Sequence, residues 1–162
     1  MALVRILIDG YSLLHGWPDL ARGRARHSAA ARDELIRQLT RYQDAVGTPI
    51  TVFFDGNRPR RGWMEPGEGA GVEVLYSLSG QTADQMIERT THRLLPYGDV
   101  LAVTDDTAER DTVVGLGGMA MSCWSFIIDL ERALAHFGDQ LKHHNRREHA
   151  QFRRRPARFP HD

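Results

Sequence analysis

Cysteine is almost absent from this sequence, because Cys123 is the only one in 162 residues. A single thiol cannot form an internal bridge, which excludes a disulfide scaffold and favours a reducing compartment. Long apolar runs are also missing, and none approaches the roughly 20 residues that a membrane-spanning helix needs. We therefore expect a soluble, cytoplasmic protein with no membrane partner.

Net charge is absent as well, since 21 basic residues balance 21 acidic ones. The charges are unevenly placed, however, because residues 141–162 hold seven basic and two acidic residues, a net charge of +5. The other 140 residues therefore carry −5. A basic tail suits a polyanionic partner and an acidic body suits a cation. A tail that merely solvates the C-terminus is the alternative.

The hydrophobic fraction of 41% and the charged fraction of 26% are ordinary for a globular protein of this length. One folded domain is expected over residues 1–138. After Gly138 the helical pattern fades into sequence rich in Arg and His. We expect residues 139–162 to form a basic, mobile tail.

Short apolar runs alternate with amphipathic segments along the domain. Expected strands cover 4–8, 49–54, 72–76, 99–103 and 119–121, and expected helices cover 28–46, 82–95, a segment ending near 116, and 123–137. Ser28 and Thr82 are suitable N-caps. Continuous apolar strands between helices predict an α/β fold with a parallel sheet of about five strands, covered on both faces.

Three predicted strands end in an acid: Asp9, Asp55 and Asp105. Because parallel strands end at one edge of the sheet, these carboxylates can converge there. Asp84 lies in the first turn of a predicted helix, and Glu88 lies one turn further along the same face. Such a cluster suits Mg²⁺ or Mn²⁺, which can promote phosphodiester hydrolysis.

Each acid also has a structural interpretation. Asp before Gly is common in turns, which could explain Asp9 and Asp55. Asp84 could complement a helix dipole and Glu88 could be solvated. Either Asp105 or Asp106 could cap the next helix. The convergence of the acids, rather than any one of them, favours a site.

Four ordered segments carry a family resemblance: 8–15 (Ile-Asp-Gly-Tyr-Ser-Leu-Leu-His), 52–56, 76–88 and 103–110. Together they resemble YacP-like NYN domains over roughly residues 3–135. The resemblance implies a three-layer, Rossmann-like fold of the PIN-like nuclease class, a divalent-metal centre and endoribonuclease activity. At least one member of the family acts on messenger RNA at the ribosome.

The resemblance also implies roles for single residues. Asp9 and Asp84 would be the principal metal ligands and catalytic acids, with Asp105 completing the centre. Ser12 stands where the family usually has asparagine, and its shorter hydroxyl could still bond a water. The supporting candidates are Ser12, Asp55, Glu88 and Asp106.

Arginines in two predicted loops are candidate RNA contacts, since the guanidinium group suits phosphate. One cluster follows the first strand and the other follows Asp55: Arg22, Arg24 and Arg26; Arg58, Arg60 and Arg61. Trp17 or Trp63 could stack on a base. Loop arginines that only aid solubility, and a Trp17 that packs against the first helix, are the alternatives.

Two other functions remain open. A non-catalytic RNA-binding adaptor would also explain the basic tail and Ser12. A small-molecule phosphohydrolase is disfavoured, because the sequence has no glycine-rich phosphate loop or aspartyl nucleophile motif.

Overall fold

The structure is a computed structural model that describes residues 2–23, 25, 28–56, 71–78 and 80–154. Its centre is a five-stranded sheet in the order β3-β2-β1-β4-β5, and every neighbouring pair is parallel. The strands are β1 (Leu3–Asp9), β2 (Ile50–Phe54), β3 (Glu73–Tyr76), β4 (Asp99–Val103) and β5 (Met119–Met121). The predicted α/β fold with a parallel sheet of about five strands is confirmed.

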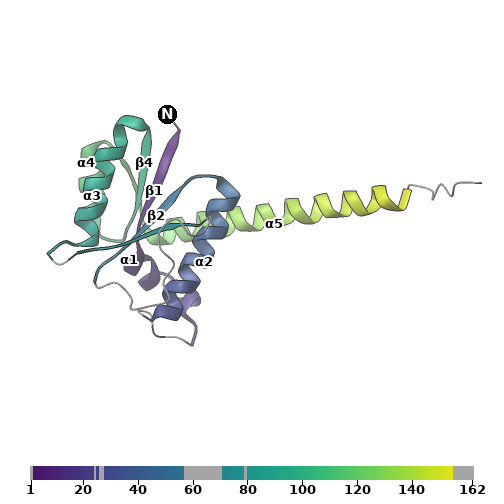
Figure 1. The fold of residues 1–162 in the computed structure, drawn as a ribbon, viewed down its shortest axis with the longest axis horizontal. Coiled ribbons are helices and arrows are strands. Elements are labelled where there is room, and N and C mark those ends of the chain that lie inside the picture. The colour runs from purple at the N-terminus through teal and green to yellow at the C-terminus, as the bar shows by residue number, and fades with distance from the viewer. Residues whose placement is uncertain (1, 24, 26–27, 57–70, 79, 155–162) are drawn as a thin grey trace, which may run out of the picture.

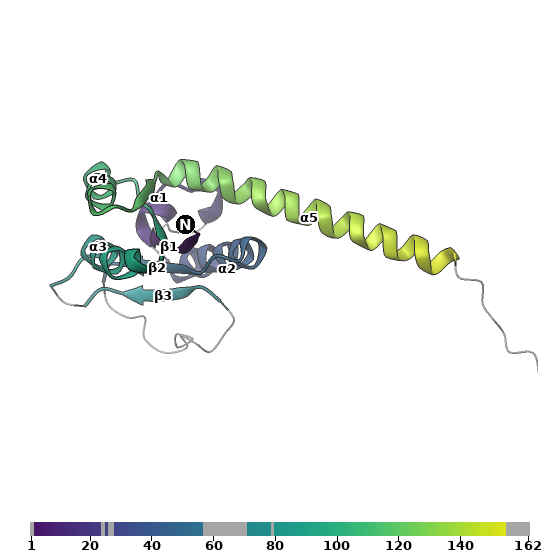
Figure 2. The ribbon, with the colours of Figure 1, turned by 90° about the horizontal axis from the view of Figure 1, so that it is seen from above.

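Helices cover both faces of the sheet and make three layers (Figure 1, Figure 2). The helices are α1 (Gly10–His15), α2 (Ala29–Val46), α3 (Ala83–Leu94), α4 (Thr107–Leu116) and α5 (Cys123–Arg154), with 3-10 turns η1 (Pro18–Ala21) and η2 (Leu95–Tyr97). Side chains of β1 alternate between the faces. Ile6 and Ile8 pack with α1, α2 and α5, and Leu7 packs with α3 and α4.

The helix starts agree with the predicted caps. The Ser28 hydroxyl accepts the Ala31 N–H at 3.1 Å. Thr82 and Gln85 form a capping box, in which each side chain accepts the other's backbone N–H. These short polar contacts fix where α2 and α3 begin, and the start of α3 carries Asp84.

The last helix differs from the prediction, because α5 continues through Gly138 to Arg154. The predicted end at residue 137 is wrong. A glycine inside a helix costs only about 1 kcal/mol, and the Leu, Gln, Lys, Arg and Ala residues that follow are good helix formers. The boundary at residue 138 between a folded domain and a basic tail stays a prediction. Residues 155–162 of the expected tail lie outside the described residues.

The segment after β1 was expected to be a turn but contains α1 and η1. Trp17, between them, is only 6% exposed and packs in the core. The expectation that it could stack on a base is therefore wrong. The alternative, that Trp17 packs against the first predicted helix, agrees with the buried cluster that Trp17 shares with Ala31, Leu35 and Leu39 of α2. In the described part of the chain, no helix has the length and apolar character to cross a lipid bilayer.

Candidate active site

The candidate site lies at the carboxyl ends of β1 and β4, where the strand order reverses. From β1 the chain continues to β2 and β3 on one side, and it returns to β4 on the other. Ligands of open α/β sheets bind at such a switch point. Asp9 is the last residue of β1, and Asp105 and Asp106 come shortly after β4.

Asp9 joins the end of β1 to the start of α1. Its Oδ1 accepts the Ser12 N–H at 3.2 Å, which makes Asp9 the N-cap of α1. The pKa of Asp9 is raised to about 6, mainly by burial and also by the nearby charges of Asp84 and Asp55, against the opposing effect of the Ser12 N–H. Asp9, Asp55 and Asp84 therefore lie in one electrostatic cluster.

Asp55 joins the end of β2 to the start of α3. Its Oδ1 accepts the Ala83 N–H at 2.5 Å and the Ser77 hydroxyl at 3.5 Å. The backbone next to Asp84 is thereby held at the sheet edge. Burial raises the pKa of Asp84, and the charges of Asp106, Asp55 and Glu88 add to the increase. All three predicted supporting acids, Asp55, Glu88 and Asp106, thus act on Asp84.

Glu109 is a site residue that the sequence reasoning missed. It is only 4% exposed, and its Oε1 has no hydrogen-bond partner among the described residues. Burial is the main cause that raises the pKa of Glu109 to about 8; a hydrogen bond to Glu88 and the charges of Asp84, Glu88 and Asp106 also raise it. Its position within the 103–110 motif was the signal that could have identified it.

Asp105 and Ser12 are brought together, but by structural hydrogen bonds. The Ser12 hydroxyl accepts the Asp105 N–H at 2.9 Å, and Asp105 Oδ1 accepts the Cys123 N–H at 2.9 Å, at the start of α5. Asp106, in contrast, caps α4 and acts on the pKa of Asp84. Of the two adjacent acids, Asp106 is the one coupled to Asp84.

Cys123 is fully buried, and burial raises the pKa of its thiol to about 12. The thiol donates to the Ser12 hydroxyl at 3.6 Å. A protonated, enclosed thiol is a poor nucleophile. Cys123 therefore packs the junction between α1, β4 and α5.

The donors of this cluster are all oxygens, which is the chemistry that hard divalent cations prefer. Among the described residues, no three acidic, histidine or cysteine side chains lie close enough together to hold a metal ion directly. Mg²⁺ usually keeps several waters and is held by one or two carboxylates. The donor set thus fits a hydrated cation bound from one side.

Only one of the predicted RNA-contacting arginines can be described. Arg22 is exposed and lies 3.4 Å from Asp19, which is also exposed. An exposed pair of this kind contributes little energy and leaves the guanidinium accessible. The remaining candidates lie outside the described residues: Arg24, Arg26, Arg58, Arg60, Arg61 and Trp63.

Comparisons with known proteins agree with this geometry. The pattern of the YacP-like NYN domain matches residues 6–157. The uncharacterized protein YacP of Bacillus subtilis strain 168 is 29% identical over 127 residues, which are 78% of this chain and 74% of the relative.

Two crystal structures of Rae1 (YacP) from Bacillus subtilis are also similar. A mutant of it has a TM-score of 0.72 at 25% identity and covers 87% of this chain and 82% of its own. The other structure, of Rae1 without a stated mutation, has a TM-score of 0.74 at 23% identity and covers 93% of this chain and 86% of its own. The chain belongs to the YacP-like NYN domain family and has the nuclease-like, PIN-like fold of that family.

Proposed function

We propose that this protein is a divalent-metal-dependent endoribonuclease that hydrolyses phosphodiester bonds in RNA. The observation that carries the proposal is the placement of three acids from separate elements at one sheet edge. Asp55 accepts the N–H of Ala83, next to Asp84, and the charges of Asp55 and Asp84 raise the pKa of Asp9. Carboxylates kept this close repel one another, and a cation offsets that repulsion. Membership of the NYN domain family supports RNA as the substrate.

Asp9 and Asp84 are the residues we assign to the cation directly. Asp105, the third predicted ligand, is assigned to the water shell of the cation, because no three such side chains among the described residues lie close enough to hold a metal ion and Asp105 Oδ1 accepts the Cys123 N–H. When bound, the cation would stabilise the charge that builds on the phosphate and make an attacking water more acidic. Asp9, with a pKa of about 6, is mostly ionised at neutral pH. Asp55 keeps Asp84 in place through the Ala83 N–H.

Glu109 has a different role in this proposal. With its pKa near 8, it is mostly protonated at neutral pH and can donate to Glu88. One negative charge is thereby removed from the cluster. Repulsion on Asp84 is lower as a result, which favours its ionised form.

The test is cleavage of a labelled single-stranded RNA by the purified full chain with Mg²⁺ or Mn²⁺. We expect EDTA and Asp84→Asn to reduce cleavage by at least a hundredfold. Asp44→Asn is the matched control, because Asp44 is exposed on α2, and it should cleave normally. If the protein cuts no RNA, either free or as messenger RNA on translating ribosomes, the proposal is wrong.

A second candidate is a non-catalytic RNA-binding adaptor. It is favoured because the Ser12 hydroxyl and Asp105 Oδ1 already accept backbone N–H groups within the fold. These hydrogen bonds link the end of β4 to α1 and α5. An adaptor would bind RNA equally well with and without Asp84→Asn and would cleave it in neither case. Metal-dependent cleavage that is lost in Asp84→Asn excludes it.

A further inference from the structure

We propose that the outer face of α5 is a binding track for single-stranded RNA that leads away from the candidate active site. In this track Trp124 stacks on a base, and Lys142 and Arg146 contact phosphates from the same face of the helix. Arg147 lies about 140° round the helix from Trp124 and reaches the phosphates from the side. The inference rests on the proposed function only in taking RNA as the polyanion.

Trp124 is the first component of the track. Its side chain is 68% exposed, whereas Trp17 is buried. Trp124 directly follows Cys123, whose N–H is bonded to Asp105 Oδ1 at 2.9 Å. An exposed indole therefore lies beside the sheet edge that carries the acids. Aromatic rings in such positions stack on bases with little dependence on sequence.

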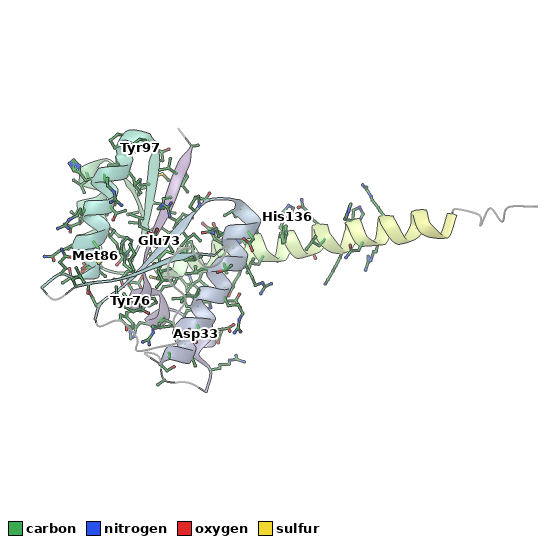
Figure 3. All side chains as sticks on the ribbon, viewed as in Figure 1. Asp33, Glu73, Tyr76, Met86, Tyr97 and His136 are labelled. Carbon is green, nitrogen blue, oxygen red and sulfur yellow. The ribbon has the colours of Figure 1, made fainter. Side chains whose placement is uncertain are left out.

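The projecting half of α5 is the second component. The helix leaves the body and extends into solvent (Figure 1, Figure 2), and side chains stand out from it beyond His136 (Figure 3). Every residue from 139 to 147 is exposed. Lys142, Arg146 and Arg147 have no ion pair with another described residue.

The spacing along α5 joins the two components. Trp124 and Lys142 are 18 residues apart, which is five full helical turns, so they lie on the same face about 27 Å apart. Arg146 is one turn beyond Lys142 on that face. A strand whose base stacks on Trp124 can therefore follow the helix outward to the cations, past Glu131, which is exposed on the same face.

The charge of the projecting half favours a polyanion such as RNA over a basic or an apolar partner. Residues 139–147 contain three cations and one acid, Asp139, and they extend from a body whose net charge is negative. Phe137 and Leu141 are also exposed, at 40% and 48%. A second copy of the chain could cover these two, and the experiment below separates that outcome.

The experiment measures the fluorescence anisotropy of a labelled 20-nucleotide oligouridylate in EDTA, with the full chain, over a range of KCl concentrations. Without metal, binding is observed separately from cleavage. One variant replaces Lys142, Arg146 and Arg147 by Gln, which has a comparable helix propensity. The matched control replaces three exposed arginines on α2 and α3 by Gln: Arg37, Arg41 and Arg93.

The two components predict different signatures. The α5 triple variant should bind at least tenfold more weakly at low salt. The slope of log affinity against log salt should become shallower by about 2, because each phosphate contact on a single strand contributes about 0.7 to that slope and three contacts are removed. Trp124→Ala should lose roughly tenfold with the slope unchanged, because stacking involves no counterion release. Trp124→Phe should recover most of that loss.

Three results would overturn the inference. The first is wild-type affinity and slope in the α5 triple variant. The second is an equal loss in the control variant, which would reduce the effect to net charge. The third is a dimer in sedimentation that Leu141→Ser dissociates while RNA binding is unchanged, which would assign the projecting half to a second copy. A chain that binds through α5 but cleaves nothing would keep this inference and refute only the nuclease.

Discussion

At the scale of single residues, Glu109 has the least expected environment in the molecule. The residue is shielded from water. Its carboxyl group interacts with Glu88 through a hydrogen bond and with Asp84 and Asp106 through their charges. Burial of an ionised carboxylate beside three acids is costly. The group avoids that cost by keeping its proton, which its raised pKa reflects.

Glu109→Gln tests this interpretation through stability. The pKa of Glu109 rises from 4.5 to about 8 on folding. The stabilisation that comes from keeping the proton is therefore complete below pH 4.5 and is lost as pH rises toward 8. Gln imitates the protonated group at every pH. We expect urea unfolding in EDTA at pH 8 to show Glu109→Gln about 2 kcal/mol more stable than the wild type, and the difference to shrink toward pH 5.

The outcome that would contradict the interpretation is a pH-independent loss of stability in Glu109→Gln. That result would mean that Glu109 is ionised and that the site depends on its charge. Glu131→Gln is the control, because Glu131 is exposed on α5 and its replacement should leave the pH dependence unchanged.

At the scale of elements, the two Asp-Gly pairs use glycine for different reasons. Gly10 starts α1, and a Cβ there would clash with the Phe54 ring, which packs against Tyr11 and Tyr76. Gly56 has open space around it but a φ of +111°, which L side chains rarely adopt. Close packing therefore requires glycine at one position, and backbone conformation requires it at the other.

Gly10→Ala should destabilise the protein through the β1–α1 junction. The methyl group must displace a fully buried ring, and overpacking of this kind costs about 1–3 kcal/mol. Chemical denaturation should show the loss, and Phe54→Leu should partly relieve it in the double variant, because the smaller side chain leaves room. Additive losses in the double variant would show that the ring is not the cause.

These elements also show what sequence can predict. Strands β1, β2 and β4 were predictable because each is an apolar run that ends near an acid, and α2 and α3 because Ser28 and Thr82 are local caps. The burial of Glu109 was not, since it depends on α3 packing against α4. Nor was the bond between Ser12 and Asp105, which are 93 residues apart. Topology predicted that Asp9, Asp55 and Asp105 converge, whereas the acids whose charges act on Asp9 are Asp84 and Asp55. The catalytic roles of these acids stay predictions.

At the scale of the whole molecule, the two signs of charge are separated in space. The body holds an acidic cluster at the sheet edge, and the projecting half of α5 holds cations well away from it. A polyanion is thus attracted mainly to α5, while the sheet edge repels it unless a cation is present. Binding and cleavage should therefore respond differently to metal: RNA affinity needs only α5, whereas the phosphate can approach the acids only after their charge is offset.

The same reasoning predicts how a cation changes the stability of the whole fold. Folding raises the pKa values of Asp9, Asp84 and Glu109, so the native state binds more protons than the unfolded chain, and its stability decreases from about pH 4 toward pH 8. Mg²⁺ or Mn²⁺ that binds only the native cluster should restore part of this loss. At 100 times its dissociation constant it contributes about 2.7 kcal/mol.

We therefore expect Mg²⁺ to raise Tm by several degrees at pH 8, and by less at pH 5.5, where protons compete for the same oxygens. The measurement is thermal unfolding at constant ionic strength, with KCl in place of MgCl₂ as the reference. In EDTA at pH 8, Asp84→Asn should unfold at a higher temperature than the wild type, because a repelling charge is gone, and Mg²⁺ should no longer shift its Tm. Asp44→Asn should behave as the wild type does. If Asp84→Asn keeps the full shift, the cation binds elsewhere, and Asp84 is not one of its ligands.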